Sequence, residues 1–125
     1  MTLNLLRVAF MAPAIGDFYL AADTLVDLFT GAITDTLPSL RFAGVALAWG
    51  VFLLLGLRRP VERAWILWPT ILAVAFVSLS SLPGYLAGEL PAARLALTLG
   101  LGAVVIALCL LGISMAGRAR RSSAT

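Results

Sequence analysis

The stretch that decides the fold is Phe42–Leu57, FAGVALAWGVFLLLGL, which runs for sixteen residues without a charge. Arg41 precedes it, and an arginine pair with a proline follows it. About 20 apolar residues, at roughly 1.5 Å each, are needed for a helix to cross a hydrocarbon layer of ~30 Å. Residues 37–57 meet this length, and their one charge lies near an end from which a long side chain can reach the interface. The stretch therefore predicts a membrane span.

Three more apolar stretches extend this prediction to the whole chain. They cover about residues 2–22, 64–82 and 92–116. The composition, 62% apolar and 12% charged, departs from the usual soluble protein, which has about half apolar and a quarter charged residues. A chain of 125 residues forms one domain. We therefore expect residues 1–125 to be a single four-span transmembrane domain of the all-α class. Because short turns make neighbouring helices antiparallel, we expect an up-down-up-down four-helix bundle.

The boundaries of these helices follow from local signals. Polar residues recur at helical spacing over residues 17–34, which predicts an amphipathic extension of the first helix, ended by Gly31. Pro60 is expected to open the third helix, and the sequence Pro83-Gly84-Tyr85 to break it. Residues 122–125 are predicted to form a disordered tail.

The arginines predict the orientation. If the N-terminus is cytoplasmic, seven of the nine basic residues lie inside and only Arg41 and Arg94 lie outside. An excess of this kind on the short connections marks the cytoplasmic side. The basic set holds no lysine, which suggests a GC-rich bacterial genome. We therefore expect a bacterial inner-membrane protein with both termini in the cytoplasm.

Several function classes are excluded by the residue types. The chain has no histidine and one cysteine, Cys109, so it has no intrachain disulfide, no Cys/His zinc set and no histidine ligand for haem. Without histidine or lysine, no serine has an evident base to make it a nucleophile. The arginines mark the ends of apolar runs and form no basic face, so no nucleic-acid partner is expected. We expect no cofactor, no metal and no catalysis.

Four charged residues form the candidate site. Asp17 is the carboxylate nearest the membrane interior, where ionisable groups are costly and often functional. Asp23 follows within two turns, and Arg41 and Arg94 begin the second and fourth spans on the same side. Such a cluster could bind a polar headgroup, a small polar solute or a proton. In the alternative interpretation, the two aspartates lie at the interface, pair with arginine or water and only set the topology.

Three functional hypotheses remain open. The first is a non-enzymatic inner-membrane accessory subunit or scaffold, with the lipid bilayer and a homo-oligomer or larger membrane complex as partners. The second is a small transporter or channel-like protein that uses the Asp/Arg cluster on its outer side. The third is a membrane redox accessory protein or enzyme.

The chain resembles the DoxX-like families of small four-span bacterial membrane proteins, many of which have no assigned function. The resemblance depends on Leu40-Arg41-Phe42-Ala43-Gly44 at the start of the second span, on FLLLGL at residues 52–57 before a basic turn, and on the amphipathic end of the first helix. It implies a four-span fold in the bacterial inner membrane. Late in the third span, where a charged or strongly polar group is expected in such relatives, this chain has Ser78, Ser80 and Ser81.

Overall fold

Four helical segments of the protein are long and apolar enough to cross a membrane. The computed structural model describes residues 2–124, and the segments are Leu3–Thr30, Thr36–Gly56, Ala64–Leu86 and Ala92–Ala124. The number of spans and the all-helical class agree with the sequence prediction. Four apolar helices of this length are compatible with a multi-pass membrane protein.

The first two helices form a hairpin. Helix α1 (Thr2–Thr30) continues through Pro13, and its 29 residues extend about 43 Å, more than the hydrocarbon layer requires. The amphipathic stretch is thus a direct continuation of the first span. Gly31 follows with a φ of 77°, a conformation that favours glycine, so the predicted stop is confirmed. Helix α2 (Thr36–Gly56) begins after Asp35.

The third span consists of three short helices, η1 (Ala64–Ile66), α3 (Leu67–Leu79) and α4 (Ser81–Leu86). The helix begins after Arg63, so the prediction that Pro60 opens it is wrong. The predicted break at Pro83 is also wrong, because this proline lies in the first turn of α4, where its missing N–H costs no helical hydrogen bond. The chain turns at Gly88 instead, whose φ is 78°.

Helix α5 (Ala92–Ala124) is longer than the predicted fourth span. Residues 122–124, expected in a disordered tail, continue the helix. The hydroxyl groups of Ser122 and Ser123 donate hydrogen bonds to the carbonyls of Ala119 and Arg120, three residues earlier. Bonds of this kind satisfy the hydroxyl groups of serines that lie within a helix.

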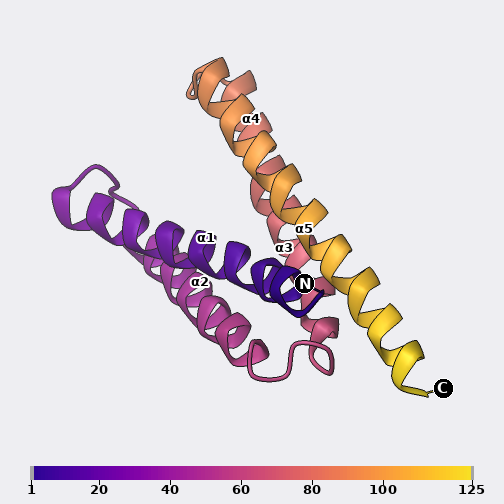
Figure 1. The fold of residues 1–125 in the computed structure, drawn as a ribbon. Helices are drawn as coiled ribbons and strands as arrows, with labels where there is room; N and C mark the ends of the chain where they lie inside the picture. The colour runs from indigo at the N-terminus through magenta and orange to yellow at the C-terminus, as the bar shows by residue number, and fades with distance from the viewer. Residues whose placement is uncertain (1, 125) are drawn as a thin grey trace.

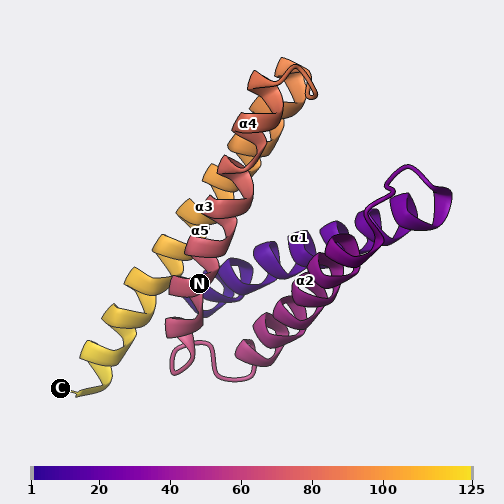
Figure 2. The same ribbon diagram turned by 180° about the vertical axis from the view of Figure 1, so that it is seen from behind.

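The spans assemble as two hairpins that diverge from one end, in the shape of a V (Figures 1 and 2). Helices α1 and α2 form one arm, and α3 and α4 pack along α5 in the other. Within the described residues, α1 packs against both α3 and α5, whereas the backbone of α2 approaches the second arm only at η1. The helices therefore do not close around a common axis along their whole length, as a complete four-helix bundle would.

The core lies where the two arms meet. Phe10 and Leu53 are fully buried there, together with Leu6, Ala9, Ala14, Ala64, Ile66, Leu67, Cys109 and Ala116. Two glycines permit this close packing. A Cβ atom on Gly56 would lie 2.5 Å from the ring of Phe10, and one on Gly112 would lie 2.7 Å from the Cβ of Ala9. Small residues of this kind allow helices to approach closely in lipid, where the hydrophobic effect does not draw them together.

Arginine side chains brace the turn between the two arms. Arg63 donates a 2.7 Å hydrogen bond to the carbonyl of Leu55, near the C-terminus of α2. From the end of α5, Arg120 donates to the carbonyls of Val61 and Glu62, at 2.7 and 3.1 Å. Arginines at this end thus donate to carbonyl groups at the C-terminus of α2 and in the turn.

Candidate functional site

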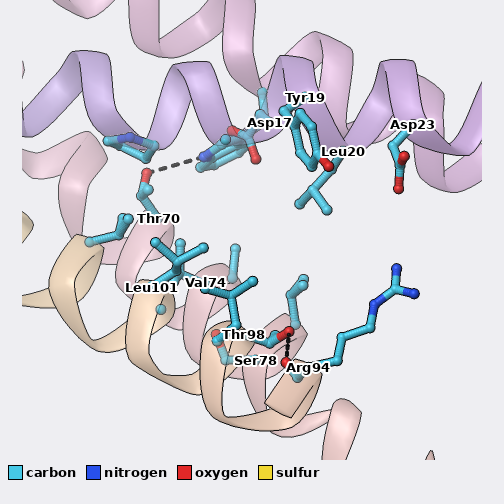
Figure 3. Close-up of a pocket in the computed structure, with 18 residues that line it drawn as sticks. Asp17, Tyr19, Leu20, Asp23, Thr70, Val74, Ser78, Arg94, Thr98 and Leu101 are labelled. Carbon is cyan, nitrogen blue, oxygen red and sulfur yellow. Dashed lines mark hydrogen bonds between the residues drawn. The ribbon is translucent and has the colours of Figure 1, made fainter. Parts of the chain in front are cut away.

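The space between the arms is a cleft of about 410 Å³ (Figure 3). Helix α1 lines one side, α3 and α5 line the other, and Trp49 is the contribution of α2. Most of the wall is aliphatic, provided by Leu20, Ala73, Val74, Val77, Leu97, Leu101 and Val105. Eight of the eighteen lining residues carry a polar group, namely Asp17, Tyr19, Asp23, Trp49, Thr70, Ser78, Arg94 and Thr98.

The cleft contains three of the four residues that the sequence singled out. Asp17, Asp23 and Arg94 all line it. Arg41 is exposed near the start of α2 and does not line the cleft. The cluster is thus formed by α1 and α5, which become neighbours only through the core at the other end of the molecule.

Asp23 and Arg94 face each other across the cleft (Figure 3). Arg94 is the third residue of α5, next to the loop at residues 87–91, so the pair lies towards the open end of the V. Among residues 2–124, the one ion pair within 4.0 Å is Arg59–Glu62, at 3.3 Å. Asp23 and Arg94 therefore stand opposite each other without touching, and the cleft remains open between them.

Asp17 lies deeper in the cleft, and one of its carboxylate oxygens lacks a hydrogen-bond partner among the described residues. Its Oδ2 atom is buried and has no hydrogen-bond partner in the described part of the chain. The helix places it against α2, because a Cβ atom on Gly50 would lie 3.4 Å from the Cβ of Asp17. A buried carboxylate oxygen without a partner costs free energy, so this atom invites a proton, a hydrogen-bond donor or a cation.

A hydrogen bond between the arms fixes the indole of Trp49. Its Nε1–H donates to the hydroxyl oxygen of Thr70 at 3.1 Å, and Thr70 in turn donates to the carbonyl of Ile66 at 2.8 Å. A tryptophan inside an apolar span usually packs against a neighbour or faces lipid, and nothing in the sequence marks its partner. The sequence shows that each of two apolar spans contains a residue able to form a hydrogen bond, Trp49 and Thr70. Their positions along the chain do not reveal that the two side chains contact each other.

The serines of the third span have separate roles. Ser80 and Ser81 donate to the carbonyls of Val77 and Ser78 in the last turn of α3, at 2.6 and 2.7 Å, as serines in apolar spans commonly do. Ser78 is buried and lines the cleft. It also packs against Gly102 of α5, where a Cβ atom would collide with its hydroxyl. Only Ser78 therefore contributes to the cleft.

The side chains that line the cleft are suited to binding a ligand through polar and apolar contacts. Within residues 2–124, no three histidine, cysteine or carboxylate side chains gather as a metal site would require. Cys109 is fully buried in the core, with its sulfur 3.8 Å from the carbonyl oxygen of Ala9. The cleft thus contains a carboxylate without a partner, a fixed indole, the opposed Asp23 and Arg94, and aliphatic walls.

No protein-family model, curated protein or solved structure matches this chain.

Proposed function

We propose that this protein is a non-enzymatic multi-pass protein of the bacterial inner membrane that binds a small amphipathic molecule within the bilayer. The cleft between its two arms is the binding site, as a small transporter or carrier would use it. One observation carries the proposal: an aliphatic cleft of about 410 Å³ that contains a buried carboxylate oxygen with no partner.

The dimensions and lining of the cleft support this function. Small-molecule sites are typically concave, have volumes of about 300–1,000 Å³ and are mostly apolar, with a few polar groups that orient the ligand. The cleft has such a volume, and its polar groups are spread from Thr70 and Asp17 to Asp23 and Arg94. A molecule with an apolar body and a polar group would satisfy both kinds of surface.

The orientation follows from the arginines. We infer that the joined end of the V, which holds the turn at residues 57–63, faces the cytoplasm, and that the open end faces outward. Reporter or cysteine-labelling experiments test this, with single cysteines in a Cys109→Ala background. A cysteine at Ser123 or Arg59 should react only with reagents that reach the cytoplasm, and one at Ala32 only with reagents outside. The reverse labelling pattern would overturn the orientation.

Binding is tested with three aromatic probes of similar bulk, namely cationic tetraphenylphosphonium, neutral triphenylmethanol and anionic tetraphenylborate. The protein is placed in lipid nanodiscs, and saturable binding above that of empty nanodiscs is measured by equilibrium dialysis. At least one probe should bind, and Leu101→Trp, which fills the cleft, should reduce that binding. Leu110→Trp is the control, because Leu110 is also exposed on α5 but lies outside the cleft. Absence of saturable binding, or equal binding by both variants, would refute the function.

Membership of a larger complex, the redox hypothesis and the DoxX-like resemblance stay predictions. Purification from native membranes in mild detergent, followed by mass spectrometry, tests the first. A stoichiometric protein partner would favour the accessory-subunit hypothesis, and a bound chromophore would favour the redox hypothesis.

A further inference from the structure

We propose that the ligand of the cleft is a lipophilic cation with a single positive charge, held with its charged centre between Asp17 and the face of Trp49. This inference depends on the proposed function and narrows it to one class of ligand. It is derived from the balance of charge in the cleft, from the position of the carboxylate that lacks a partner, and from the fixed orientation of the indole.

The charge of the cleft favours a cation. Asp17 and Asp23 bring two carboxylates, and Arg94 brings one guanidinium. Arg94 extends towards Asp23 (Figure 3), so the single cation of the cleft is directed at the outer carboxylate. Arg94 is thus directed at Asp23 at the mouth, and the deeper Asp17 forms no ion pair with any residue of the described chain.

Within the membrane, the lack of a counter-charge for Asp17 has a large energetic cost. In a medium of low dielectric constant, an ionised carboxylate is stable only when a partner neutralises it or a proton replaces its charge. In the free protein a proton can occupy Asp17. A bound cation would displace this proton and leave the carboxylate paired, so a charged guest can enter the bilayer without carrying an unbalanced charge.

Trp49 provides a second contact for a cation. Its Nε1–H is already used by Thr70, so the ring cannot donate a hydrogen bond to a ligand. What it presents is an aromatic surface, which attracts a positive charge placed over the ring, most strongly when water is excluded. Asp17 and Trp49 both line the cleft, and Gly50, the residue after Trp49, lies against Asp17.

The remaining wall selects for a lipophilic body. Val74, Val77, Leu97 and Leu101 face the cleft from α3 and α5, and Leu20 extends into it from α1. A small, strongly hydrated ion could not bury this surface. An organic ammonium or phosphonium ion with apolar substituents would contact the wall and the carboxylate together.

The experiment compares tetraphenylphosphonium with tetraphenylborate, which have nearly the same shape and opposite charge. In nanodiscs of zwitterionic lipid, the wild-type protein should bind the cation at least about tenfold more tightly than the anion, after subtraction of empty nanodiscs. This comparison requires no variant. Equal affinity, or preference for the anion, would refute the inference while leaving the proposed function intact if Leu101→Trp still blocks binding.

A set of variants then locates the charge. Asp17→Asn, which preserves the size of the side chain, should weaken binding of the cation about tenfold or more and leave binding of neutral triphenylmethanol unchanged. Asp27→Asn is the matched control on the same helix, since Asp27 does not line the cleft. Trp49→Phe should weaken cation binding by a smaller factor, and Trp65→Phe should not change it. Full cation binding by Asp17→Asn would contradict the assignment.

Discussion

The close contact between α5 and α1 gives the sharpest test of the fold. Gly112 lies in the core, and a Cβ atom added there would be 2.7 Å from the Cβ of Ala9, 3.1 Å from Leu67 and 3.2 Å from Leu6. Favourable carbon–carbon contacts lie at about 3.5–4.0 Å. The two leucines can change rotamer, but Ala9 has no rotatable side chain. Gly112→Ala must therefore push the two helices apart by roughly 1 Å.

The size of the effect can be set against a control on the same helix. Overpacking of a core typically costs about 1–3 kcal/mol, whereas replacement of glycine by alanine within a helix gains up to about 1 kcal/mol. Gly100→Ala receives the same gain without the cost, because no atom lies within 4 Å of its added Cβ. The free energy of unfolding of Gly112→Ala should thus fall about 1–3 kcal/mol below that of Gly100→Ala.

The protein contains its own reporter for this measurement. Cys109 is its single cysteine and is fully buried, so a thiol-reactive fluorophore should label it only when the core opens. Midpoints of thermal labelling in detergent would be compared with loss of helical circular dichroism in sodium dodecyl sulfate. The second probe guards against a change confined to the surroundings of Cys109, which lies one turn from Gly112.

A compensating change makes the test specific. Ala9→Gly removes the methyl group that the new side chain meets, so the double variant Ala9→Gly with Gly112→Ala should recover part of the lost stability. The coupling between the two changes should be about 1 kcal/mol or more. Equal stability of Gly112→Ala and Gly100→Ala, or strictly additive effects in the double variant, would refute the packing of α1 against α5 described above.

Three further predictions concern the hydrogen bonds and the surface. Trp49→Phe and Thr70→Val should each destabilise the protein by about 0.5–1.5 kcal/mol and the double variant by little more than one of them, as measured by detergent unfolding, because both remove the same bond. Arg120→Ala should speed hydrogen exchange or proteolysis at residues 57–63, because Arg120 donates to two carbonyls of that turn. Arg121→Ala should not change these rates, and equal rates in the two variants would contradict the role of Arg120 in holding the turn. Leu72→Arg and Phe76→Arg should each impair membrane insertion by about 2–3 kcal/mol, because both side chains are more than 70% exposed on a predicted span; normal insertion in a translocon assay would contradict a lipid-facing position.

The sequence predicts a cluster of four charged residues on one side of the membrane but no cleft between helices. Asp17 and Asp23 could be singled out without coordinates, because an ionisable side chain within a membrane span costs free energy and is often functional. Arg94 lines the same cleft as the two aspartates, whereas Arg41 lies outside it. All four residues were expected on the outer side of the membrane. A shared side of the membrane does not determine which helices pack against each other.

The number of spans, the helical class and the stop at Gly31 could be determined from the sequence by itself. The first two follow from the length of apolar runs, because a hydrocarbon layer admits only segments that satisfy their own backbone hydrogen bonds. The stop follows from the freedom of glycine at positive φ. These are local properties, and no knowledge of distant residues is needed to read them.

Only the tertiary structure decided that the four spans form two arms joined at one end, with a cleft between them. That arrangement depends on contacts between residues far apart in the chain, such as Phe10 with Gly56, Ala9 with Gly112 and Trp49 with Thr70. Glycines occur throughout the spans, and the sequence does not reveal which of them a neighbouring helix will approach. In lipid, an apolar helix face is equally well solvated by another helix and by acyl chains. Hydrophobicity therefore does not determine which helices pair, and the steric fit of individual side chains does.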